Sequence, residues 1–131
     1  MARVLSSAVY GIDPLVMGLA PAWAIPLAIS RAGLTPEQID VWEVHEAFSA
    51  QALGVLRELP HQLGGFTVPD AKLTPNGGAV AIGHPFGATG TRYVLTLATE
   101  LRERKARYGV AGVCIGSGQG AAIVLENPHA G

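Results

Sequence analysis

The sequence predicts an α/β fold, in which helices cover both faces of a mixed sheet and the elements follow the order β-α-β-α-β-α-β-β. Short apolar runs typical of buried strands alternate with longer stretches in which apolar residues recur every three or four positions. Glycine or proline separates most of these segments. The last two apolar runs are joined only by GSGQ, which indicates a hairpin. We expect right-handed crossovers in such a layer.

The first half of the chain is expected to contain two strands and two helices, at residues 2–10, 22–32, 40–44 and 46–59. Gly33 should end the first helix. Pro26 fits best in the first turn or so of that helix, because proline has no amide proton. The TPEQ stretch combines an N-cap Thr35, Pro36 and a capping-box Gln38, which is the signature of a short helical turn.

The second half is expected to contain a short strand, a long helix and two final strands, at residues 71–74, 89–108, 110–115 and 120–126. The long helix has one apolar face, and basic residues near its C-terminal end would complement the helix dipole. Gly109 is expected to end this helix.

Length and composition limit the classes of protein. The 131 residues fit one domain, residues 1–131, and 49% are hydrophobic while only 15% are charged. This apolar surplus indicates faces buried against a second domain or subunit. The net charge of −1 disfavours nucleic-acid binding, and no apolar run reaches the roughly 18 residues of a membrane span. Without a signal-peptide pattern or a second cysteine, a cytoplasmic protein is expected.

Two histidines lie where chemistry is expected in such a fold. His45, in EVHEAF, falls between a strand and a helix, although a lone histidine there often only caps or packs. His84 lies in NGGAVAIGHPFGATG, whose five glycines allow a ligand to approach the backbone closely. This segment lacks GxGxxG and a P-loop lysine, so a phosphate cradle is disfavoured. A structural role and a functional role for His84 both stay open.

The only cysteine, Cys114, ends a strand before a glycine-rich turn. Amides of such a turn can converge on an oxyanion, but a free cysteine is often a small buried hydrophobe. Zinc binding and a Cys–His nucleophile pair are alternatives for Cys114 and the two histidines. Their wide spacing lacks the paired ligands of usual zinc sites.

Three motifs in order, HEAF, NGGAVAIGHPFGATG and CIGSGQG, resemble the C-terminal half of the thiolases, and the similarity runs over about residues 2–126. The resemblance implies a thiolase-like half with acyl-CoA and coenzyme A as substrates and no further cofactor. A histidine at position 45, where most thiolases have asparagine, is similar to the degradative, trifunctional-complex type of fatty acid β-oxidation.

The same resemblance implies roles for individual residues. His84 is similar to the histidine that activates the thiolase nucleophile and helps to form an oxyanion hole. Cys114 resembles the cysteine that moves a proton at the carbon α to the thioester, and a neighbouring imidazole is expected to help lower its pKa. The Gly116 amide resembles a donor of the second oxyanion hole, and His45 falls where a catalytic water is held. Phe48 is expected to line the acyl cavity, together with Met17.

One feature departs from the family pattern. The thiolase nucleophile is another cysteine, carried by the N-terminal half, whereas Cys114 is the only cysteine here. We therefore expect a catalytic half that works only with an N-terminal half, in an oligomer. The alternatives are a non-catalytic binding or assembly module, an inactive fragment, and a hydrolase that uses Cys114 with His84.

Overall fold

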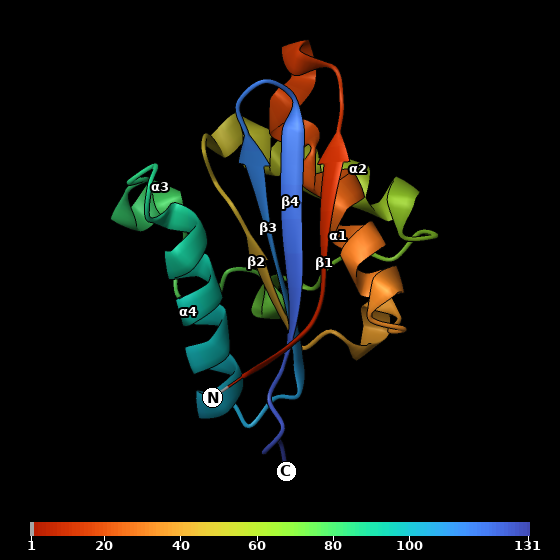
Figure 1. The fold of residues 1–131 in the computed structure, drawn as a ribbon, viewed down its shortest axis with the longest axis vertical. Helices are drawn as coiled ribbons and strands as arrows, with labels where there is room; N and C mark the ends of the chain where they lie inside the picture. Colours follow the sequence, from red (N-terminus) through yellow and green to blue (C-terminus); the bar gives the residue numbers. More distant parts are fainter. Residues whose placement is uncertain (1) are drawn as a thin grey trace.

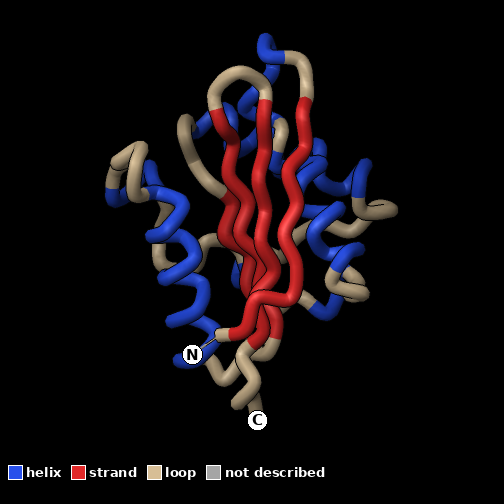
Figure 2. The backbone as a smooth tube through the Cα atoms, viewed as in Figure 1, coloured by secondary structure: helices blue, strands red, loops and turns tan. Residues whose placement is uncertain are grey.

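A four-stranded sheet forms the centre of the molecule, seen in a computed structural model that describes residues 2–131. Its strands are β1 (Arg3–Gly11), β2 (Val41–Val44), β3 (Tyr108–Ile115) and β4 (Gln119–Glu126). The strand order is β1-β4-β3-β2, and β4 pairs antiparallel with both neighbours while β2 pairs parallel with β3. The β3–β4 hairpin therefore occupies the middle of the sheet (Figure 2). This arrangement confirms the predicted mixed α/β fold.

Helices cover both faces of the sheet (Figure 1). Helices α1 (Pro21–Arg31) and α2 (Ser49–Gln62) pack on one face, and α4 (Thr89–Glu103) packs on the other. Short helical turns connect these elements, namely η1 (Pro14–Leu19), η2 (Pro36–Gln38), η3 (Asp70–Lys72) and α3 (Ala79–Ile82). Within residues 2–131, no helix combines the length and the apolarity that crossing a membrane requires.

Alternation along β2 separates the two cores. Trp42 and Val44 pack in the core beneath α1 and α2, whereas Val41 packs in the core beneath α4. Because side chains of a strand alternate between faces, Glu43 and His45 point toward the α4 side. Both are buried, at 1% exposure. The ionisable side chains of this segment thus lie on one face of the strand only.

The predicted third strand, residues 71–74, is wrong. Asp70–Lys72 forms η3, and only Leu73 makes a bridge, with Trp42. The Thr74 amide then donates to the Trp42 carbonyl at 2.7 Å, and Thr74 adopts a left-handed φ of 39°. This conformation turns the chain away from β2 after a single bridge. The segment therefore covers the edge of the sheet without extending it.

The long helix is also shorter than predicted, because it ends at Glu103 and not at Tyr108. Lys105 adopts a φ of 54° and reverses the chain without a glycine. The Asp40 carboxylate then accepts hydrogen bonds from the Arg107 and Tyr108 amides, at 2.8 and 3.0 Å, which aligns these residues with the sheet. Gly109, the expected helix stop, lies within β3.

Other helix boundaries shift by a few residues. Helix α2 begins at Ser49 and not at Glu46, because the Gln51 side chain caps it by accepting from the Ala47 amide at 2.9 Å. Pro26 lies in the middle of α1 and not in its first turn. The TPEQ turn forms as predicted, with the Gln38 side chain accepting from the Thr35 amide at 2.8 Å.

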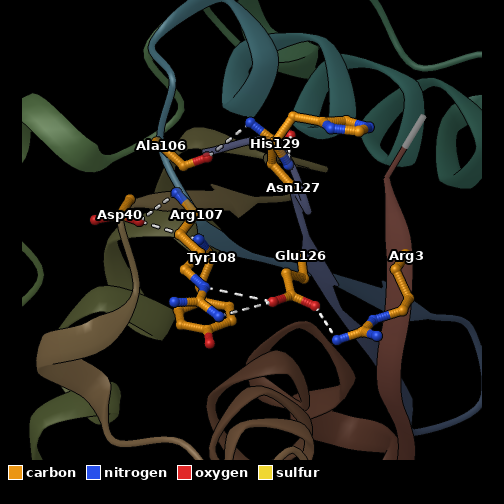
Figure 3. Close-up of polar contacts among 8 residues, drawn as sticks. All are labelled: Arg3, Asp40, Ala106, Arg107, Tyr108, Glu126, Asn127 and His129. Carbon is orange, nitrogen blue, oxygen red and sulfur yellow. Dashed lines mark hydrogen bonds and ion pairs between the residues drawn. The ribbon is translucent and has the colours of Figure 1, made fainter. Parts of the chain in front are cut away.

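A polar cluster ties together the sheet end at which β2 and β3 begin (Figure 3). The buried Glu126 carboxylate pairs with Arg3 of β1 and with Arg107, which precedes β3. The Asn127 side chain donates to the Leu101 and Ala106 carbonyls at 3.2 and 3.1 Å, which binds the end of α4 to β4. The glycine-rich loops lie at the opposite end of the sheet, where β2 and β3 finish.

Candidate active site

The carboxyl ends of β2 and β3 and the start of α4 surround a cavity of about 710 Å³. Every predicted site residue lines this cavity, namely Met17, His45, Phe48, His84, Cys114 and Gly116. Side chains from four separate stretches of the sequence therefore meet here. Parallel pairing of β2 with β3 accounts for part of this, because it brings the ends of both strands to one edge.

His45 follows β2 directly and lies deep in the cavity wall. Its amide donates to the Gly112 carbonyl at 2.9 Å, which holds it against β3. Its ring lies 4.4 Å from the His84 ring and 5.4 Å from the Tyr93 ring, measured between centroids. Neither ring nitrogen has a hydrogen-bond partner among the described residues. The structure thus gives the His45 side chain no capping role within this part of the chain.

Burial determines the protonation of His45. It lowers the pKa of His45 to about 4, and the charges of His84 and Arg92 add to this effect. The ring is therefore neutral at physiological pH. A neutral imidazole offers one donor and one acceptor, so His45 can hold a water molecule or a polar atom of a ligand.

His84 is presented by a tight turn between α3 and α4. Gly83 precedes it with a φ of 87°, a conformation that glycine adopts without strain. The Nδ1 atom of His84 lies 2.7 Å from the Thr89 hydroxyl, and its ring packs 4.7 Å from the Phe86 ring. The ring is thereby held from two sides while it lines the cavity.

Glu46 and Tyr93 anchor the segment that leads to His84. The Glu46 carboxylate accepts from the Val80 amide at 3.1 Å, and the Tyr93 hydroxyl accepts from the Ala79 amide at 3.1 Å. A Cβ at Gly78 would lie 2.5 Å from the Glu46 carboxylate, so this close approach requires glycine. Sequence reasoning did not select Glu46 or Tyr93, although both lie within or beside the motifs.

Cys114 is half-buried near the end of β3, opposite Gly120 of β4. Burial raises the pKa of its thiol, whereas a neighbouring imidazole was expected to help lower it. The difference arises because desolvation outweighs every other influence on this thiol within the chain. Cys114 therefore keeps its proton at neutral pH, which suits a proton donor better than a nucleophile.

The turn after Cys114 is held against the loop before η1. Gly116 lies outside the strand ladder, because β3 ends at Ile115. Ser117 and Gly118 adopt φ angles of 71° and 87°. A Cβ at Gly118 would lie 2.3 Å from the Ile12 carbonyl oxygen, so only glycine permits this contact. The turn thus places Gly116 beside the cavity on a constrained backbone.

Apolar side chains form the mouth of the cavity. Phe48 is 68% exposed and Phe86 is 86% exposed, and both line the cavity with Met17. Both rings are accessible to an apolar group that enters the cavity.

Glu43 lies behind the site, two residues before His45 and on the same face of β2. Both of its carboxylate oxygens are buried without a hydrogen-bond partner among the described residues. Burial raises the pKa of Glu43 to about 7, nearby Glu100 and Glu46 add to the shift, and Arg92 opposes it. Sequence analysis did not identify this residue. No group of three or more metal-binding side chains is arranged for an ion in residues 2–131, so the zinc alternative finds no ligand set there.

Comparisons with known proteins show which family the chain resembles. Residues 1–127 match the family model described as "Thiolase, C-terminal domain". The chain is 49% identical over 124 residues to 3-ketoacyl-CoA thiolase B, peroxisomal, of Rattus norvegicus, covering 94% of this chain and 28% of the relative. It is 45% identical to the beta-ketoadipyl-CoA thiolase of Acinetobacter baylyi, covering 95% of this chain and 30% of that protein.

Solved structures show the same relationship. The crystal structure of human mitochondrial 3-ketoacyl-CoA thiolase matches with a TM-score of 0.89 and 41% sequence identity, over 97% of this chain and 30% of that chain. The same human enzyme in complex with CoA matches with a TM-score of 0.88. The chain spans less than a third of the length of these relatives. Since the family model covers nearly the whole chain, this chain belongs to the thiolase family and corresponds to its C-terminal domain.

Proposed function

We propose that this chain is the C-terminal catalytic half of a thiolase, which transfers an acyl group between a 3-ketoacyl-CoA and coenzyme A. The observation that carries this proposal is the single cavity lined by His84, Cys114, Gly116 and His45. The relatives named above are thiolases of 3-ketoacyl-CoA and beta-ketoadipyl-CoA, which agrees with this substrate class.

The residues present fit the steps of such a reaction. A thiol attacks the 3-keto carbon, the bond between C2 and C3 breaks, and its electron pair moves onto C2 as an enolate. Cys114, which keeps its proton because burial raises its pKa, donates that proton to C2. His84 accepts the proton of the attacking thiol, and the Gly116 amide donates to the developing oxyanion. The acyl group is then bound to the attacking thiol as a thioester. The thiol of coenzyme A attacks this thioester and gives its proton to the Cys114 thiolate, and the released thiolate takes back the proton from His84. His45 holds a water molecule between these groups.

The attacking thiol must come from outside these 131 residues. Cys114 is the only cysteine, and its assigned task is proton transfer. The nucleophile would be supplied by an N-terminal half, either in the same longer polypeptide or in a partner chain. The exposed Phe48 and Phe86 rings at the cavity mouth would then contact the acyl chain or that half. The working enzyme is proposed to be an oligomer.

Reconstitution tests this function. The chain is combined with an N-terminal thiolase half that carries its cysteine, and the purified complex is assayed for CoA-dependent cleavage of acetoacetyl-CoA and of a longer 3-ketoacyl-CoA. Activity is expected in the complex, with losses on the order of a hundredfold or more for His84→Ala and for Cys114→Ala. A complex that forms but cleaves neither substrate would contradict the proposal.

The lack of a second cysteine for the nucleophile supports a second candidate function, a binding or assembly module without catalysis. In that case the His84→Ala and Cys114→Ala chains would serve the biological role as well as the unaltered chain. Loss of that role in either variant would exclude this alternative. A hydrolase that uses Cys114 as its nucleophile agrees poorly with a thiol that burial keeps protonated.

A further inference from the structure

Thr89, the first residue of α4, lies between the site and the helix. It is buried at 3% exposure and lines the cavity beside His84. Its hydroxyl oxygen lies 2.7 Å from His84 Nδ1 and 2.9 Å from the Pro85 carbonyl oxygen. One side chain therefore joins the imidazole to the backbone of the turn that carries it.

Counting protons favours one direction for these two hydrogen bonds. A threonine hydroxyl has a single proton to donate, whereas a carbonyl oxygen can only accept. The contact with Pro85 therefore uses the hydroxyl proton, and the hydroxyl oxygen is left to accept from His84 Nδ1. If Thr89 instead donated to Nδ1, its hydroxyl oxygen would face the Pro85 carbonyl oxygen at 2.9 Å with no proton between them, which is unfavourable even though that carbonyl also accepts from the Ala88 and Thr89 amides, at 2.8 and 2.9 Å.

From this geometry we infer that Thr89 is a positioning residue that holds neutral His84 in the tautomer with its proton on Nδ1. The lone pair of Nε2 is then the one available to a group in the cavity, since His84 makes no other hydrogen bond among the described residues. In water the neutral histidine ring favours the opposite tautomer, with the proton on Nε2. The surrounding residues thus select the basic nitrogen before any ligand arrives.

The consequence for catalysis rests on the proposed function, whereas the tautomer itself does not. A base that must take a proton from a thiol needs a free lone pair on the nitrogen that faces that thiol. With the opposite tautomer, His84 would present an N–H group and would have to rearrange first. Thr89 would therefore affect the rate of the chemical step more than substrate binding.

Heteronuclear NMR of the isotopically labelled chain tests the tautomer directly. Long-range proton–nitrogen correlations distinguish protonated from unprotonated ring nitrogens, and spectra are recorded at an alkaline pH where the rings are neutral. The signals of His84 are assigned from their loss in a His84→Gln chain. We expect protonated Nδ1 in the unaltered chain and in Thr89→Ser, which keeps the hydroxyl. We expect Thr89→Val, which keeps the shape but not the hydroxyl, to shift toward protonated Nε2.

A protonated Nε2 in the unaltered chain would overturn the inference, and so would identical His84 spectra for the unaltered chain and a folded Thr89→Val. If Thr89→Val does not fold, the spectra of the unaltered chain and of Thr89→Ser decide the matter. In the reconstituted complex, Thr89→Val should lower kcat about ten- to a hundredfold with little change in KM, and Thr89→Ser should restore it. An inactive complex whose His84 carries the expected tautomer would remove the proposed function but leave this inference standing.

Discussion

Glu43 and His45 lie two residues apart on one strand, and burial shifts their titrations in opposite directions. Burial raises the pKa of Glu43 to about 7 from 4.5 and lowers the pKa of His45 to about 4 from 6.5. Neither side chain has a hydrogen-bond partner among the described residues. Both are therefore kept neutral in the folded chain under conditions in which the unfolded chain ionises them.

The two groups contribute to stability with opposite signs. As the pH rises from 4.5 to about 7, the unfolded chain loses the Glu43 proton while the fold retains it, so stability falls. As the pH falls from 6.5 to about 4, the unfolded chain protonates His45 while the fold does not, so stability again falls. Between pH 7 and pH 5, each group changes the free energy of unfolding by roughly 2 kcal/mol. The two contributions largely cancel in the unaltered chain.

Removing one of the two side chains should expose the pH-dependent stability contribution of the other. Glu43→Gln retains the size of the side chain without the titrating carboxyl. On going from pH 7 to pH 5, its free energy of unfolding should fall by roughly 2 kcal/mol relative to the same change in the unaltered chain. His45→Asn is the matched control. Over the same change from pH 7 to pH 5, its free energy of unfolding should rise by roughly 2 kcal/mol relative to the change in the unaltered chain.

Urea denaturation of the three chains at both pH values measures these differences, and an unchanged slope with urea shows that the same surface is exposed. Titrations of all other groups are shared by the three chains, so they cancel in the comparison. Parallel pH profiles for the unaltered chain and Glu43→Gln would refute the reasoning. They would mean that the Glu43 carboxyl is solvated in the folded chain.

Three further predictions concern the site and its supports. Gly118→Ala should cost on the order of 3 kcal/mol in urea denaturation, because its Cβ meets backbone at a positive φ, whereas Gly116→Ala, with open space around it, should cost less than about 1 kcal/mol. Tyr93→Phe should cost about 1 kcal/mol and speed hydrogen exchange at the Ala79 amide, since it removes that amide's acceptor; unchanged exchange would contradict the contact. Alkylation of Cys114 at pH 7, followed by mass spectrometry, should be at least about tenfold slower in the folded chain than in urea, and equal rates would disprove the buried thiol.

The regular elements were predictable where local pattern decides them. The β3–β4 hairpin, the capped η2 turn and the amphipathic α2 and α4 lie within a few residues of their predicted positions. The prediction of a strand at residues 71–74 was wrong because so short a stretch does not reveal whether its backbone can stay extended, and Thr74 adopts a left-handed φ that turns the chain away. The predicted C-terminal end of α4 was wrong because the Asp40 carboxylate, which is distant in sequence, aligns the residues after the helix with β3.

The residue types of the site were readable from the sequence alone, because the glycine-rich motifs around His84 and Cys114 and the strand end at His45 are local features. Their meeting in one cavity depends on the strand order β1-β4-β3-β2, which no local pattern specifies. The roles of Glu43, Tyr93 and Thr89 also required the tertiary structure. Burial and hydrogen-bond partners depend on which elements pack together. They determine the raised pKa of the Glu43 carboxyl, the anchoring of the loop by Tyr93 and the proposed tautomer of His84.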